Sequence, residues 1–106
     1  MLANEWVTSE GAGAWLQIQC PASVRIWKIR LRGRASGSER ITSWNIAGST
    51  GGVFTTLLTS TTALGSTAQE FLVTTGTAFS IYRLNVTAAE PTNIGISHFQ
   101  IFTRNI

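Results

Sequence analysis

Short apolar segments recur along the whole chain at intervals of about ten residues, and Gly, Ser, Asn or Pro separates each segment from the next. Within a segment, apolar and polar residues alternate. Leu16 and Ile18, for example, share one face of a strand, and Gln17 and Gln19 share the other. Alternation of this kind buries one side of a strand and leaves the other in water. The pattern predicts an all-β fold, an antiparallel sandwich of two sheets with seven or eight strands.

The segments and their inward faces define the expected strands and core. The chain has 106 residues, of which 43% are hydrophobic and 12% charged, and this fits one core and a single domain over residues 1–106. The predicted strands are Ala14–Cys20, Val24–Arg32, Ile41–Ala47, Val53–Leu58, Glu70–Thr75, Ser80–Thr87 and Ile94–Thr103. The residues expected in the core are Leu16, Ile18, Trp27, Ile29, Leu31, Trp44, Ile46, Leu84, Val86, Phe99 and Ile101.

The residue types that the chain lacks argue against an enzyme. The sequence contains no Asp, five Glu, and only one His (His98) and one Cys (Cys20). Zinc sites, disulfide frameworks, aspartate calcium loops and Ser/His/Asp triads all need residues that are missing. No apolar run reaches the roughly 20 residues of a membrane span. We therefore expect a soluble, non-catalytic chain with no secretion signal and no membrane insertion.

The positive charge is concentrated in one segment. The net charge is +3, and the isoelectric point is about 10.0. Five basic residues fall within ten positions, and they are Arg25, Lys28, Arg30, Arg32 and Arg34. One interpretation is a solvated strand face, because Lys28, Arg30 and Arg32 alternate with apolar residues. The other is a surface that faces an anion such as a phosphate, a nucleic acid or an acidic sugar.

The order of the motifs resembles a known family. The basic strand WKIRLRGR, the segment SWNIAGSTGG, and YRLNVT followed by GISHFQIF occur in the order found in coagulation factor 5/8 type C, or discoidin-like, domains. The resemblance covers nearly the whole chain and implies a galactose-binding-like jelly roll. The Thr/Ser/Gly-rich composition, with one Lys among eight basic residues, is further similar to versions in phage tail fibres and other virion appendages.

The chain departs from this family at its start and at one acidic position. Only Met1 to Glu5 precede Trp6, so we expect the family's first strand to be missing or replaced. The resemblance also places His98 where many members have an acidic calcium ligand. Because Ca²⁺ needs oxygen ligands and the chain has no Asp, we expect no structural calcium and no cofactor. We interpret His98 as a strand residue hydrogen-bonded to a neighbouring loop, and Cys20 as a small buried residue rather than a reactive thiol.

The resemblance implies a ligand site on loops at one end of the sandwich. In such modules an aromatic ring stacks on a sugar, while Arg and Asn side chains bond its hydroxyls. Arg34 matches the family's position for a ligand-bonding Arg. Trp6 is either the stacking ring or a lid over the end of the core, and Trp15 is in phase with Gln17 and Gln19 rather than with the core. The predicted ligand-binding residues are Trp6, Glu10, Arg34, Glu39, Arg40, Glu90 and Asn93.

Three functions remain open at this stage. The first is a carbohydrate-binding module that attaches a tail fibre or similar virion appendage to a host glycan. The second is a structural domain for trimerisation or capsid decoration, alone or within a longer fibre protein, and it needs no ligand. The third is a polyanion or nucleic-acid binder that uses Lys28, Arg30 and Arg32. Nucleic acid is disfavoured because no aromatic residues for base stacking are interleaved with these side chains on their face.

Overall fold

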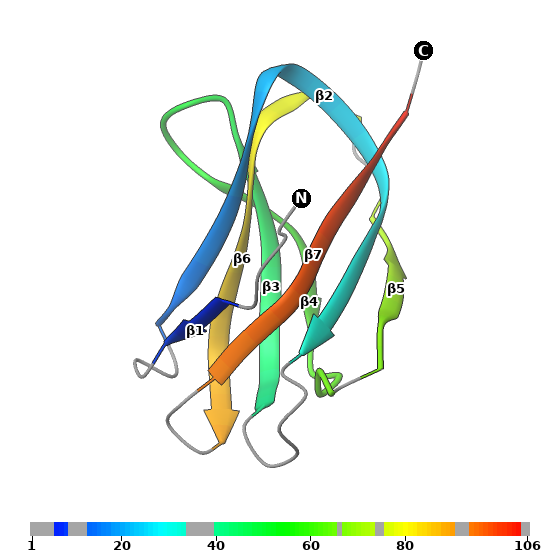
Figure 1. The fold of residues 1–106 in the computed structure, drawn as a ribbon. Helices are drawn as coiled ribbons and strands as arrows, with labels where there is room; N and C mark the ends of the chain where they lie inside the picture. The colour runs from blue at the N-terminus through cyan, green and yellow to red at the C-terminus, as the bar shows by residue number, and fades with distance from the viewer. Residues whose placement is uncertain are drawn as a thin grey trace.

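The computed structural model describes residues 6–8, 13–33, 40–65, 67–73, 76–90 and 94–104, and its fold is drawn in Figure 1. The secondary structure of these residues is β throughout, and all paired strands are antiparallel. The strands are β1 (Trp6–Thr8), β2 (Trp15–Gly33), β3 (Arg40–Ser49), β4 (Thr55–Ser60), β5 (Gln69–Leu72), β6 (Phe79–Glu90) and β7 (Ile94–Arg104). The predicted all-β antiparallel sandwich is confirmed.

The long strand β2 joins the two layers of the sandwich. Its first half pairs with β6, and its second half pairs with β7 and β5, so the strand curls from one sheet into the other (Figure 1). Sheet A contains β1, β7, the second half of β2, and β5, whereas sheet B contains the first half of β2, β6, β3 and β4. The sequence predicts two separate strands around Pro21. The structure has one, with a register shift between Gln19 and Val24.

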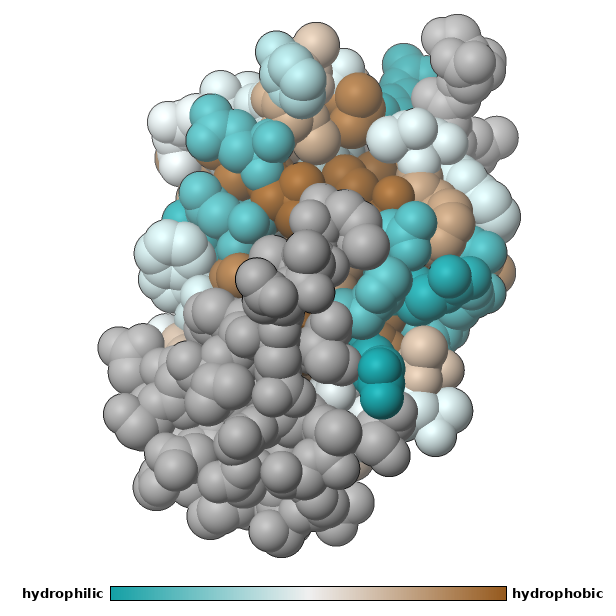
Figure 2. Space-filling model, viewed as in Figure 1, coloured by the Kyte–Doolittle hydropathy of each residue, from teal (hydrophilic) through white to brown (hydrophobic). Residues whose placement is uncertain are grey.

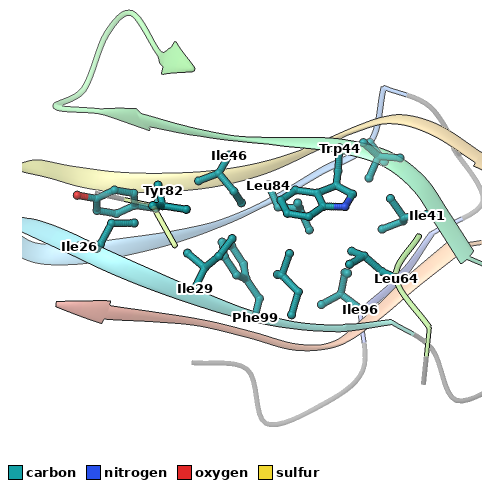
Figure 3. Close-up of a cluster of buried hydrophobic side chains, with 14 of the residues drawn as sticks. Ile26, Ile29, Ile41, Trp44, Ile46, Leu64, Tyr82, Leu84, Ile96 and Phe99 are labelled. Atoms are coloured by element: carbon teal, nitrogen blue, oxygen red, sulfur yellow. The ribbon is translucent and has the colours of Figure 1, made fainter. Parts of the chain in front are cut away.

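The core lies between the inner faces of the two sheets. In Figure 3, Trp44, Ile46 and Leu84 of sheet B point toward side chains of sheet A such as Ile29 and Phe99. Apolar burial of this kind is the main favourable contribution to folding. Seven residues predicted for the core are confirmed as buried, and they are Ile29, Leu31, Trp44, Ile46, Leu84, Val86 and Phe99. Three others are only partly buried against the core, and they are Leu16, Ile18 and Ile101.

The prediction that Trp27 lies in the core is wrong. Its side chain is 38% exposed, whereas its neighbour Ile26 is fully buried. The reason is a β-bulge: Ile26 faces Thr103 of β7 and Lys28 faces Phe102, so Trp27 is an extra residue in β2. An extra residue reverses the alternation of the strand at that point. Trp27 therefore lies outside, where its ring makes an edge contact with Phe102.

The surface of the fold combines polar and apolar side chains. Figure 2 shows apolar side chains between the first half of β2 and β7, bordered by hydrophilic ones. The partly buried apolar residues of β2 that pack against the core are Leu16, Ile18, Cys20 and Val24. In the described part of the chain, no helix has the length and hydropathy needed to cross a membrane.

Candidate functional site

Strand ends from four different parts of the sequence meet at one end of the sandwich. Arg40, the first residue of β3, is the register partner of Glu90, the last residue of β6. On sheet A, Ile96 near the start of β7 pairs with Gly33 at the end of β2 on one side and with Trp6 on the other. The connections β2–β3 and β6–β7 therefore leave from the same end of the fold, as the loop-site prediction requires (Figure 1).

The structure brings together the strand positions of three predicted ligand-binding residues. Trp6, Arg40 and Glu90 lie in β1, β3 and β6, and their backbones sit at or near this end. The other predicted residues lie outside the described residues, and they are Glu10, Arg34, Glu39 and Asn93. Their roles stay predictions.

Close backbone contacts fix the point where β2 ends. The Gly33 N–H donates a 2.7 Å hydrogen bond to the carbonyl of Gly65. The neighbouring Leu64 N–H donates a 2.9 Å bond to the carbonyl of Ile41, and the Leu64 side chain is buried. A Cβ on Gly33 would lie 2.9 Å from the Gly65 oxygen, which is closer than packed atoms tolerate. Glycine is therefore required here by the close approach of two backbones.

A second group of side chains lies on the outer face of sheet B. The Arg83 guanidinium carbon is 4.0 Å from the ring centroid of Trp15 and 4.0 Å from that of Phe54. Arg83 Nε and Nη2 donate hydrogen bonds of 3.1 and 2.9 Å to Gln17 Oε1. Two aromatic rings and one amide thus hold the guanidinium in a fixed orientation. Trp15 is 48% exposed, which confirms that it lies off the core.

A tight turn places Phe54 in this group. The buried Ser49 hydroxyl accepts hydrogen bonds of 3.0 and 3.1 Å from the N–H groups of Gly51 and Gly52. Gly51 has a φ of 130°, a conformation open to glycine but strained for other residues. The turn reverses the chain after β3 and brings Phe54 to Arg83.

The basic residues of β2 form a different cluster on the outer face of sheet A. Glu70 of β5 accepts a 2.8 Å hydrogen bond from Arg30 Nε and a 3.2 Å bond from Lys28 Nζ, and Arg30 Nη2 contacts it as well. The Lys28 ammonium also lies 4.4 Å from the Phe102 ring centroid. Glu70 offsets one of the positive charges of this segment. The rings of Trp27 and Phe102 lie beside Lys28, so the expectation that no aromatic residue accompanies the basic side chains on this face is wrong.

The Glu70 cluster predicts a small dependence of stability on pH. The hydrogen bonds from Arg30, and then those from Lys28, lower the pKa of Glu70 below its ordinary value. A lowered carboxyl pKa contributes stability above the ordinary pKa, and this stability is lost as the pH falls through the lowered pKa. Urea unfolding should therefore show that Glu70→Gln is slightly less stable than the unmodified chain at neutral pH. The difference should disappear in acid, and an equal difference at both pH values would contradict the assignment.

The lone His and Cys occupy ordinary strand positions. His98 Nε2 lies 2.9 Å from Gln100 Oε1 on the same strand. This hydrogen bond within β7 differs from the predicted one, which joined His98 to a neighbouring loop. Cys20 is partly exposed and packs against the core, and burial raises the pKa of its thiol. Within the described residues, no three His, Cys, Asp or Glu side chains lie close enough to hold a metal ion.

The family assignment comes from comparison with protein-family models. Residues 1–102 match the model described as "Domain of unknown function (DUF7402)". The chain belongs to the DUF7402 family. A search of curated proteins finds no match to it.

The fold of this DUF7402 domain is that of family 32 carbohydrate-binding modules. One such module of Clostridium perfringens, solved with GalNAc-β-1,3-galactose, has a TM-score of 0.82 at 13% identity and is matched over 94% of this chain and 76% of its own. The family 32 module of C. perfringens NanJ, solved with galactose, has a TM-score of 0.80 at 15% identity, and the match covers 93% of this chain and 76% of that module. A chitosan-binding module of Paenibacillus sp. IK-5, solved with chitotriose, has a TM-score of 0.77 at 18% identity, and the match covers 92% of this chain and 76% of that module. The resemblance to discoidin-like, galactose-binding-like domains is thus confirmed at the level of fold.

Proposed function

We propose that this DUF7402 domain is a non-catalytic carbohydrate-binding module whose site lies at the end of the sandwich where β2, β3, β6 and β7 meet. The observation that carries the proposal is the fold match over 92–94% of the chain to modules solved with sugars. The convergence of strand ends supports it, because the loops that leave these ends can present ligand-binding side chains from a rigid frame.

The proposed contacts follow from the chemistry of the predicted residues. Trp6 offers an aromatic surface for the apolar face of a pyranose ring, and Arg34 offers a guanidinium fork for hydroxyls or a carboxylate. Glu10, Glu39, Arg40, Glu90 and Asn93 supply further hydrogen bonds. Arg40 and Glu90 start from paired backbone positions, which supports their acting on one ligand.

The proposed setting is a virion tail fibre or appendage that attaches to a host-cell glycan. Its support is the Thr/Ser/Gly-rich, Lys-poor composition of the chain. Single-site sugar binding is normally weak, and a trimeric fibre would raise the avidity by engaging several sites together. Sedimentation of the full chain tests this part, since a trimer is expected.

A glycan array on the full chain tests the proposed function directly. Retention on a defined set of glycans is expected, with the same ranking in a solution titration of the best ligand. If the chain sediments as a trimer but binds no glycan at high density, the structural alternative replaces the proposal. Binding to every polyanion, with a steep loss in salt, would favour the polyanion alternative instead.

Replacing Arg34 by Ala is expected to lower glycan affinity by about tenfold or more, because a charge-assisted hydrogen bond is lost. The melting temperature should change little. Arg30→Ala is the matched control, since Arg30 lies on sheet A with Glu70 and should leave the affinity for a neutral glycan unchanged. Isothermal titration with the best array ligand measures both variants. A critical Arg30 and a dispensable Arg34 would overturn the strand-end site.

A further inference from the structure

The outer face of sheet B carries a row of polar and aromatic side chains that crosses four strands. Trp15 of β2 pairs with Asn85 of β6, Asn85 pairs with Asn45 of β3, and Asn45 pairs with Thr59 of β4. In the adjacent register row, Ile46 pairs with Leu84, and both side chains are fully buried in the core. Because successive residues of a strand face opposite sides, the Trp15 row faces outward. Three strand spacings make the row about 14 Å long, which is enough for more than one sugar ring.

The groups along this row are arranged for directional hydrogen bonds. Asn85 Nδ2 donates a 2.9 Å bond to Asn45 Oδ1, so the two amides hold each other in place. Each amide retains one polar atom for which the described residues supply no recorded hydrogen bond, namely Asn85 Oδ1 and Asn45 Nδ2. The nearly half-exposed ring of Trp15 lies at one end of the row.

Arg83 adds a fixed positive charge beside this row. Its carbon Cζ lies 4.0 Å from the rings of both Trp15 and Phe54, and two of its five N–H donors bind Gln17. Glu70 is the one carboxylate whose side chain the structure describes, and its ion pairs join it to Lys28 and Arg30 on sheet A. Arg83 therefore keeps three donors and its charge without a carboxylate partner among the described side chains.

We propose that this outer face of sheet B is a second glycan-binding surface, which takes an oligosaccharide bearing a carboxylate. Arg83 binds the carboxylate through its remaining donors, because a planar guanidinium fork matches that group. Trp15 stacks against a pyranose ring, and the Asn45–Asn85 pair bonds hydroxyls farther along the chain. Since the rings and Gln17 already fix the guanidinium, binding costs little side-chain entropy.

This surface is separate from the strand-end site. Arg40 lies five residues before Asn45 on β3, which corresponds to about 17 Å along an extended strand. The mixture of amides, a hydroxyl and one exposed indole favours a sugar over an apolar protein interface. The proposal does not depend on Arg34 or on the loops at the end of the sandwich, so the two sites can be tested apart.

The test measures binding of the full chain to an oligogalacturonate, to its carboxyl-reduced neutral counterpart and to dextran sulfate. We expect Arg83→Gln to weaken oligogalacturonate binding by about tenfold or more and to change binding of the neutral counterpart much less. Trp15→Ala should weaken binding of both oligosaccharides. Arg30→Gln removes the same charge from sheet A and should leave the affinity within about twofold, because Arg30 lies beside Glu70 on the other sheet.

Arg83→Lys decides the question if Arg83→Gln disturbs folding. The lysine keeps the charge but loses the planar fork, so most of the carboxylate preference should be lost while the melting temperature is kept. Equal losses for Arg83→Gln and Arg30→Gln, with dextran sulfate bound as well as oligogalacturonate, would overturn the proposal in favour of general charge attraction. Failure of the unmodified chain to bind oligogalacturonate at millimolar concentration would overturn it outright. Loss of oligogalacturonate binding in Arg34→Ala alone would assign the acidic sugar to the strand-end site.

Discussion

Trp44→Ala is expected to lower the free energy of unfolding by about 3–5 kcal/mol, the range found for buried aromatic residues. The Trp44 side chain is fully buried, and its ring packs edge-on against Phe71 with centroids 4.8 Å apart. Its Nε1–H donates a 2.9 Å hydrogen bond to the carbonyl of Thr62. Truncation removes the packing and the hydrogen bond together, and it leaves a cavity between the two sheets (Figure 3).

Trp27→Ala is the matched control, because the same chemical change is made at a tryptophan that is 38% exposed. Urea unfolding followed by far-ultraviolet circular dichroism measures both variants. The loss for Trp27 should be clearly smaller than that for Trp44. A loss below about 1 kcal/mol for Trp44→Ala would show that its side chain is not in the core.

This pair of tryptophans shows how far the sequence predicts the fold. Both residues are in phase with apolar neighbours, and both are therefore predicted to point inward. Trp44 does so, whereas the bulge opposite Phe102 turns Trp27 outward. A bulge is defined by the pairing of two strands that lie about 75 positions apart in the chain, so local alternation does not reveal it. Local alternation therefore predicts where the strands lie, but it does not predict which face of β2 Trp27 occupies.

The candidate sites differ in the same way. The alternation of Tyr82, Arg83 and Leu84 in YRLNV predicts that Arg83 points outward, and the phase of Trp15 predicts the same for its ring. That these two side chains meet Phe54 depends on the pairing of β2 with β6 and on the turn after β3. The sequence therefore predicts the orientation of Arg83 and of Trp15, but it does not predict that they meet Phe54. At the strand end, the pairing of Arg40 with Glu90 likewise emerges only from the register of β3 and β6.

Gly33→Ala is expected to destabilise the domain by about 1–3 kcal/mol, because the added methyl group overpacks a site without free space. A Cβ there would meet the backbone carbonyls of Leu64 and Gly65, which are less able to move than the end of a flexible side chain. Leu64 is itself fixed, since its side chain is buried and its N–H bonds to Ile41. The strain must therefore shift β2 or break the Gly33–Gly65 hydrogen bond.

Gly65→Ala separates this close approach from a general effect of replacing glycine. Gly65 takes part in the same hydrogen bond, but a Cβ on Gly65 has no neighbour within 4 Å, so its stability should stay within about 0.5 kcal/mol of the unmodified chain. Chemical unfolding measures both variants, and equal values for the two would show that the backbones are not in contact in solution. Because Gly33 directly precedes Arg34, the strand-end proposal adds a second expectation. Folded Gly33→Ala should bind glycan more weakly than folded Gly65→Ala, since displacement of β2 moves the start of the segment that carries the guanidinium.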